Sequence, residues 1–211
     1  MSTITPPVTF VIPTAIAPPT RKRWTRAQYH RLGDEGWFQD QRVELIDGEI
    51  IVLSPQSPQH YTCTERVRRL LEQCLGPQYW VRAQGPMVEG DYSEPEPDIS
   101  VVHGKIEDFD QKHPVTAALV VEVAKTSLPY DTGIKQHLYA SMGVPDYWVL
   151  DLNGHRLLVS RQPIVDPSAP FGHRYQSSSI VDASGRVTPV AAPHVQLAVA
   201  DMLPPAAGTN P

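Results

Sequence analysis

The sequence AALVVEV at residues 117–123 constrains the fold more than any other segment. All of its residues except Glu122 are apolar, which is typical of a strand buried on both faces of a sheet. A carboxylate inside such a strand is costly unless a cation neutralises it. We therefore expect a central strand here, with positive charge beside Glu122.

The residues after this strand predict a helix over 131–142 that ends at Gly143. Asp131 stands at or near the N-cap of this helix, and Lys135 follows one turn later on the same face. A structural ion pair with Lys135 or with an arginine is the simplest way to neutralise Glu122. A binding or catalytic site is the alternative.

The remaining pattern predicts a mixed α/β (α+β) domain with a central sheet flanked by helices. Upstream, we expect a short helix from Thr25, a hairpin over 43–53 around Asp47-Gly48, a helix over 59–75, and strands at 79–83, 87–89 and 99–103. Downstream, we expect a hairpin of 147–151 with 156–160, and a final pair of 174–181 with 186–190.

Proline marks the expected domain boundaries. Of the 22 prolines, five fall within residues 1–20 and five within 189–211. Proline lacks the backbone donor of helices and sheets, so both ends predict extended tails. We expect tails at 1–23 and 191–211 around one domain at 24–190.

Length and composition set further bounds. A chain of 211 residues can bury a core without disulfides or structural metals. Cys63 and Cys74 lie about 16 Å apart along the predicted helix, too far for a bridge. We therefore expect reduced thiols and a cytoplasmic protein. The sequence has no apolar run long enough to cross a membrane and no signal-peptide pattern.

A second acid, Asp98, immediately precedes the strand at 99–103. If that strand and the strand of Glu122 are antiparallel neighbours, both carboxylates converge at one end of the sheet. Two carboxylates, a strand carbonyl such as that of Val123, and waters would suit Mg²⁺ or Mn²⁺. A nearby lysine could orient or deprotonate an attacking water and stabilise charge on a phosphate.

The order of these residues resembles the PD-(D/E)XK nuclease superfamily and, more narrowly, the bacterial Uma-two family of restriction-endonuclease-like proteins. The resemblance covers roughly residues 25–160. Its pieces are VELIDGEI at 43–50, Ser54-Pro55 with His60, Pro97-Asp98-Ile99, VVEV at 120–123, DTGIK at 131–135, Tyr139, and GVPDYWVLD at 143–151.

The resemblance implies a mixed four-stranded sheet flanked by helices and a metal-dependent endonuclease that cuts DNA with a metal-activated water. It implies metal ligation by Asp98 and Glu122, with Glu44 as the upstream acid. The standard motif places a lysine two residues after the second acid, where this chain has Ala124. Lys135 on the next helix fills that role; Lys125, the fallback, would point to the other face of the strand.

Each candidate also has a purely structural interpretation. Asp98 alone would be a turn acid that caps backbone donors, and Glu44 could lie on a solvated face of its hairpin. Asp131 is favoured as a plain N-cap, and a lone Lys135 would ordinarily be solvated. His60 either lines the cleft or is a hydrogen-bonded structural histidine.

Charge argues against a generic nucleic-acid binder, because the chain carries a formal net charge of -5. A nuclease with this charge should bind DNA weakly, with strong salt dependence and with dependence on a metal, or should need its dimer or a partner to hold DNA. The competing hypothesis is a catalytically silent fold that serves as a protein-binding or assembly module. Its homodimer interface would be an exposed apolar strand at 147–150. Tyr139, Tyr147 and Trp148 predict core or dimer packing.

Overall fold

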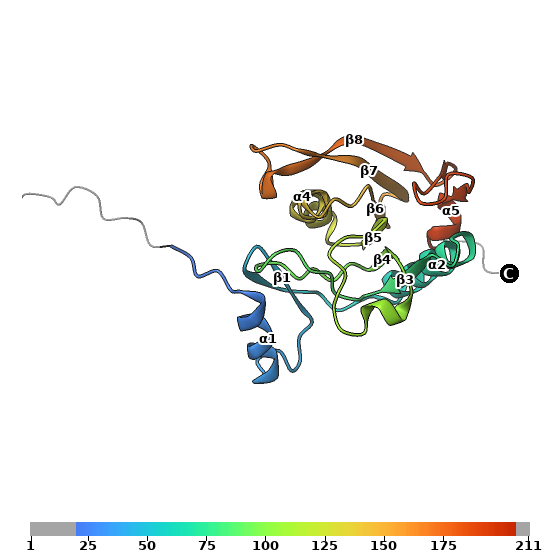
Figure 1. Ribbon diagram of the computed structural model, residues 1–211. Helices are drawn as coiled ribbons and strands as arrows, with labels where there is room; N and C mark the ends of the chain where they lie inside the picture. Colours follow the sequence, from blue (N-terminus) through green and yellow to red (C-terminus); the bar gives the residue numbers. More distant parts are fainter. Residues whose placement is uncertain (1–19, 206–211) are drawn as a thin grey trace, which may run out of the picture.

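The computed structural model describes residues 20–205 and contains a central six-stranded sheet (Figure 1). The strands lie in the order β3 (Tyr79–Ala83), β4 (Ile99–His103), β5 (Leu119–Ala124), β6 (Asp146–Asp151), β7 (Arg156–Val165) and β8 (His173–Asp182). Only β5 and β6 are parallel. The predicted mixed sheet flanked by helices is confirmed, with two strands more than the resemblance implied.

Strand β5 is the buried centre that its sequence predicts, since all six of its residues are buried. It pairs antiparallel with β4, and Ile99 lies opposite Val121. The condition for bringing Asp98 and Glu122 to the same end of the sheet is therefore met.

A continuous helical segment connects β5 to β6. It consists of α3 (Leu128–Tyr130), the π-helix η2 (Asp131–Lys135) and α4 (Gln136–Ser141). The segment begins three residues earlier than predicted, because Pro129 is well tolerated in a first helical turn. Asp131 has helical dihedral angles (φ -68°, ψ -39°), so its assignment as N-cap was wrong.

Two hydrophobic cores lie on the two faces of the sheet. On one face, α2 (Pro58–Cys74) and α5 (Val199–Met202) pack against apolar residues of β5 such as Val121 and Val123. On the other face, Leu138 and Tyr139 of α4 pack against Val120. Alternate residues of β5 therefore serve opposite cores, which leaves Glu122 on the α4 side.

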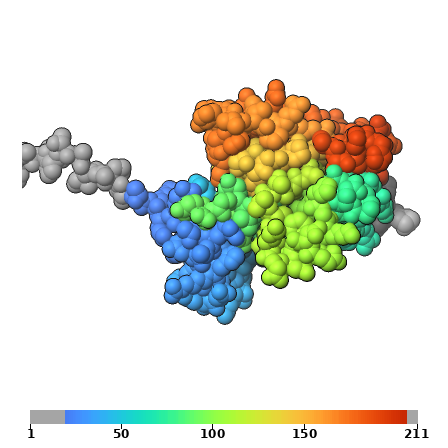
Figure 2. Space-filling model, viewed as in Figure 1, coloured from blue at the N-terminus to red at the C-terminus, as the bar shows by residue number. Residues whose placement is uncertain are grey.

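The predicted hairpin forms a separate two-stranded sheet, β1 (Val43–Ile46) and β2 (Glu49–Val52). Its turn residues have positive φ, 51° at Asp47 and 79° at Gly48, as a tight Asp-Gly turn requires. The preceding helix α1 (Arg26–Asp34) starts at a capping box of Thr25 and Gln28. In Figure 2, the blue segment that carries α1 forms a lobe beside the body.

The C-terminal part differs from the prediction. β9 (Arg186–Val187) pairs with β10 (Leu197–Ala198), whereas β8 pairs with β7. The segment predicted as a strand at 87–89 forms only an isolated bridge from Glu89. Val199 and Met202 enter the core, so the folded part extends past the expected boundary at residue 190. Of the tails predicted at 1–23 and 191–211, residues 1–19 and 206–211 lie outside the described residues.

The strand predicted as a dimer surface is also different. All residues of β6 are buried between β5 and β7, so the prediction of an exposed strand at 147–150 was wrong. Tyr139, Tyr147 and Trp148 are core residues, with 5.1 Å between the two tyrosine ring centroids. Cys63 and Cys74 are both free thiols. Within residues 20–205, no helix has the length and apolar character needed to span a bilayer.

Candidate active site

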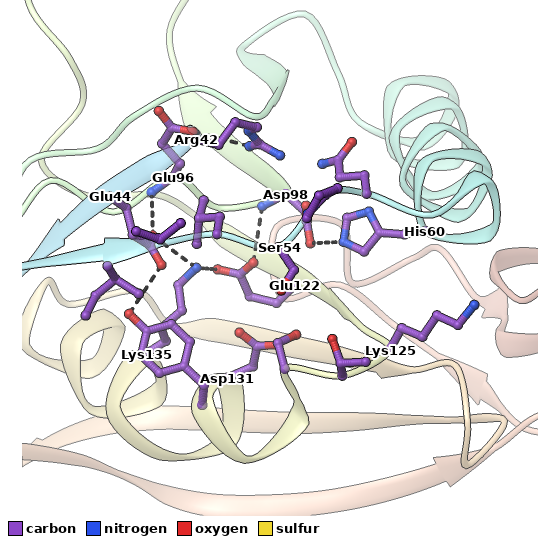
Figure 3. Close-up of a pocket in the computed structure, with 18 of the residues that line it drawn as sticks. Arg42, Glu44, Ser54, His60, Glu96, Asp98, Glu122, Lys125, Asp131 and Lys135 are labelled. Carbon is purple, nitrogen blue, oxygen red and sulfur yellow. Dashed lines mark hydrogen bonds and ion pairs between the residues drawn. The ribbon is translucent and has the colours of Figure 1, made fainter. Parts of the chain in front are cut away.

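A cleft of about 580 Å³ opens between the β1–β2 hairpin, the start of α2 and the helical segment after β5 (Figure 3). It contains all seven side chains singled out from the sequence for a site. These are Glu44, His60, Asp98, Glu122, Lys125, Asp131 and Lys135. Residues up to 91 positions apart in the sequence therefore line one cavity.

Lys135 connects two acids at the floor of this cleft. Its Nζ lies 2.7 Å from Glu122 Oε1 and 3.3 Å from Glu44 Oε2. All three residues are at most 3% exposed. Glu44 thus faces the site and not the solvated side of its hairpin. The arrangement also shows why Lys135 is buried although an isolated helix lysine is ordinarily solvated.

Asp98 lies beside this cluster. Its Oδ2 accepts hydrogen bonds from the backbone N–H of Val123 at 2.8 Å and from His60 Nε2 at 3.0 Å. The backbone N–H of Asp98 donates to Glu122 Oε2 at 3.3 Å. The two acids therefore converge at the ends of adjacent strands, and Asp98 caps a backbone donor at the same time.

The backbone N–H and carbonyl of Val123 both point towards β4, the strand that Asp98 precedes. The next carbonyl, that of Ala124, accepts from Leu152 N on the β6 side. Backbone groups of successive residues alternate in direction along a strand, so the Val123 carbonyl faces the β4 side, where Asp98 lies. A carbonyl oxygen is thus directed towards the Asp98 end of the sheet.

The π-helix positions the two candidates that follow β5. Asp131 and Lys135 are both buried, at the first and last positions of η2. Asp131 Oδ2 accepts from Ser127 Oγ at 2.6 Å, and its carbonyl accepts from Tyr147 Oη at 2.8 Å. π-turns occur frequently at functional sites, because the added residue redirects side chains of an otherwise regular helix.

Two tyrosines complete the cluster although neither was predicted as a site residue. Tyr130 Oη donates to Glu44 Oε1 at 3.3 Å, and Tyr139 Oη donates to Glu122 Oε1 at 2.8 Å. Tyr139 has the helical spacing of a core residue, and it is one; only its hydroxyl reaches the site. Tyr139 was a signal only as one piece of the family resemblance, and no sequence pattern distinguishes Tyr130 from an ordinary apolar position.

The rim of the cleft carries further charges. Arg42 pairs with Glu96 at 3.3 Å, and both residues line the cleft. Lys125 donates from Nζ to Gln59 Oε1 at 3.0 Å, whereas the buried acids Glu44 and Glu122 pair with Lys135. Sequence reasoning did not identify Glu96 as a cleft residue. Its place in the acidic run Glu94-Pro95-Glu96-Pro97-Asp98, two residues before Asp98, could have identified it.

The floor of the cleft has an excess of negative charge. Four buried carboxylates, of Glu44, Asp98, Glu122 and Asp131, face one buried ammonium. Burial raises the pKa of Glu122 to about 8 although Lys135 lowers it, and burial raises the pKa of Asp131 to about 6. Burial also opposes the charge of Lys135, but the carboxylates outweigh it and hold the Lys135 pKa well above its usual value. Lys135 therefore stays charged.

This set of donors fits a divalent cation with oxygen ligands. No group of three or more His, Cys, Asp or Glu side chains within residues 20–205 has the arrangement of a preformed metal cage. Mg²⁺ does not need one, since it commonly binds one or two carboxylates and keeps several waters. Asp98, Glu122 and the Val123 carbonyl meet that requirement, and the surplus carboxylates favour a cation.

Comparisons with known proteins agree with this picture. The model of a family described as "Uma2: Putative restriction endonuclease" matches residues 26–200. A crystal structure of "a putative nuclease belonging to DUF820" from Anabaena variabilis ATCC 29413 has a TM-score of 0.65 and 15% sequence identity, and the match covers 84% of this chain and 96% of that chain. At that identity the likeness concerns the fold. No curated protein matches the chain.

Proposed function

The chain belongs to the Uma2 family of restriction-endonuclease-like proteins, and from this premise we propose that it is a divalent-metal-dependent endonuclease that hydrolyses phosphodiester bonds in DNA. The observation that supports this proposal is the convergence of Asp98, Glu122 and Lys135 at the floor of an open cleft. The family and the fold support a nuclease-like function, and the acids and the lysine of the cleft are groups that metal-dependent hydrolysis requires.

Asp98, Glu122 and the Val123 carbonyl would hold Mg²⁺ or Mn²⁺. A bound divalent ion polarises a phosphoryl oxygen and lowers the pKa of a bound water. Lys135 acts as a hydrogen-bond donor and not as a base, because its pKa is raised well above the usual value. Its ammonium would orient the attacking water or a phosphate oxygen. Glu44 pairs with that ammonium, and Tyr130 in turn donates a hydrogen bond to Glu44.

Two cationic side chains at the rim would contact the flanking phosphates. Arg42 and Lys125 lie on opposite sides of the acidic floor in Figure 3. Arg42 is exposed and Lys125 is partly exposed, so both can reach a backbone that crosses the cleft. Since the rest of the chain is acidic, we expect these two contacts to contribute much of the electrostatic binding.

The test is a cleavage assay on plasmid and linear DNA with Mg²⁺ or Mn²⁺. Asp98→Asn and Glu122→Gln should each lower the cleavage rate more than about 100-fold. Mutation of a residue that only hydrogen-bonds to a metal ligand already lowers metal affinity or activity 10- to 100-fold. Asp110→Asn, an exposed acid outside the cleft, is the matched control. Absence of cleavage by the wild type, or cleavage that survives in both variants, contradicts the proposal.

One observation favours the alternative of a catalytically silent module. Lys135 already pairs with both Glu122 and Glu44 without any metal. Calorimetric titration with Mn²⁺ separates the alternatives, because a silent module with a permanent ion pair should release no heat of binding. For either function, the two free thiols, Cys63 and Cys74, suit the reducing cytoplasm.

A further inference from the structure

Strand β8 is an open edge of the central sheet. It is the last strand in the order, and no other strand within residues 20–205 pairs with its outer side. It is ten residues long, and the stretch from Gln176 to Ile180 is exposed throughout. Figure 1 shows β8 along the upper rim of the molecule. A strand of this length presents a row of backbone groups over about 33 Å.

This edge lacks the features that usually prevent strands from associating. Short length, proline, lysine and inward-pointing charges protect most edge strands. β8 contains neither proline nor lysine, and its QSSSIV stretch at 176–181 carries no charge. The opposite edge, β3, is half as long and carries the buried Arg82. Of the two edges of the central sheet, the β8 edge is therefore the one that suits pairing along its whole length.

The sequence of β8 is complementary to itself. In an antiparallel pair of two copies centred on Ser178, Arg174 lies opposite the partner's Asp182, and the symmetry repeats this contact at the other end. Both side chains are exposed in the single chain, where Arg174 Nε also pairs with Asp166 Oδ2 at 2.8 Å; Asp182 would be its second acidic partner. Gln176 then lies opposite the partner's Ile180, and like charges never meet. A shift of the centre by one residue along the strand would remove both ion pairs.

We propose that β8 pairs with β8 of a second copy of this chain, so that one sheet continues across a two-fold axis at Ser178. Such an interface uses the same surface on both subunits, as closed dimers do. The cleft lies at the ends of β4 and β5, several strands away, and stays open. The proposal does not depend on the proposed function.

The first test is the mass of the full chain in solution, by light scattering after size exclusion at micromolar concentrations. We expect twice the chain mass of 23.4 kDa. Ser178→Lys places two ammonium groups opposite each other at the axis and should give monomers with unchanged circular dichroism. Thr116→Lys, at an exposed position before β5, is the matched control and should remain dimeric.

The second test fixes the register by cross-linking in a Cys74→Ser background. Ser178→Cys should form an intermolecular disulfide on mild oxidation, because identical residues face each other at the axis at about 5 Å between Cα atoms. Gln176→Cys should not, since its two copies lie about 13 Å apart. The Gln176→Cys and Ile180→Cys double variant should cross-link again. A monomeric wild type, or equal cross-linking at 176 and 178, overturns the proposal.

Discussion

Lys135 Nζ lies 2.7 Å from Glu122 Oε1, and this ion pair joins the central strand to the π-helix that follows it. The standard nuclease motif carries its lysine on the strand of the second acid. Here the strand has Ala124 at that position, and the crossover helix returns an ammonium to the same carboxylate from the α4 side of the sheet. Lys125 contacts Gln59 at the rim instead.

Removal of the Lys135 charge should destabilise the metal-free protein. Lys135→Met leaves Glu122 and Glu44 buried without their cation, which typically costs about 3–5 kcal/mol. Urea unfolding at pH 8 measures the change, with Lys125→Met as the control because Lys125 is partly exposed and has no acidic partner within residues 20–205. A loss below about 1 kcal/mol, the level of an exposed pair, would contradict the assigned role of Lys135.

Stability of the metal-free protein should depend on pH through Glu122. Burial raises its pKa from 4.5 in the unfolded chain to about 8 in the folded protein. The folded state therefore binds the Glu122 proton more tightly, and the free energy of unfolding should fall as pH rises from 4.5 to about 8 and then level off.

Glu122→Gln removes this titration and isolates its contribution. The difference in unfolding free energy between wild type and Glu122→Gln, measured by denaturant at several pH values, should decrease towards pH 8. The pKa of Asp131 is also raised, to about 6, so its titration changes the unfolding free energy in the same direction. Both proteins contain Asp131, so this contribution cancels in the difference between them. A difference that grows with pH would show that Lys135 dominates the protonation of Glu122.

The sequence predicts the part of this site that depends on local patterns. The apolar run around Glu122 identifies a central strand, and the Asp47-Gly48 turn identifies the hairpin. Glu44 could not be assigned to a face, because its burial depends on where the crossover helix packs. The same holds for Tyr130 and Tyr139, whose hydroxyls gain partners only in the folded protein.

The errors have a common physical origin in tertiary neighbours. The strand at 147–150 is apolar throughout, which fits a dimer surface as well as a buried strand, and its sequence does not show that β5 and β7 pair with both of its edges. The four prolines within residues 189–205 favour an extended tail, yet Leu197, Val199 and Met202 supply enough apolar surface to cover α2. Helices as short as α5 are stabilised by packing and leave no periodic signal.

His60 should act on the site through Asp98. Its Nε2 lies 3.0 Å from Asp98 Oδ2, and both side chains are largely buried. Loss of such a partner typically lowers metal affinity 10- to 100-fold. Calorimetric titration of His60→Ala with Mn²⁺ should show this loss, whereas the exposed His194→Ala should bind like the wild type. Equal affinities for both variants would make His60 a purely structural residue.

The two rim cations should determine how DNA binding responds to salt. Each phosphate contact contributes about 0.9 to the slope of log K against log [salt], so Arg42→Gln and Lys125→Gln should each reduce the slope by about that amount. Fluorescence anisotropy of labelled DNA in an Asp98→Asn background measures binding without cleavage. Arg69→Gln, whose side chain is 73% exposed on α2 and does not line the cleft, is the matched control. If all three variants reduce the slope equally, binding is diffuse over the surface, and the cleft does not select the path of the DNA backbone.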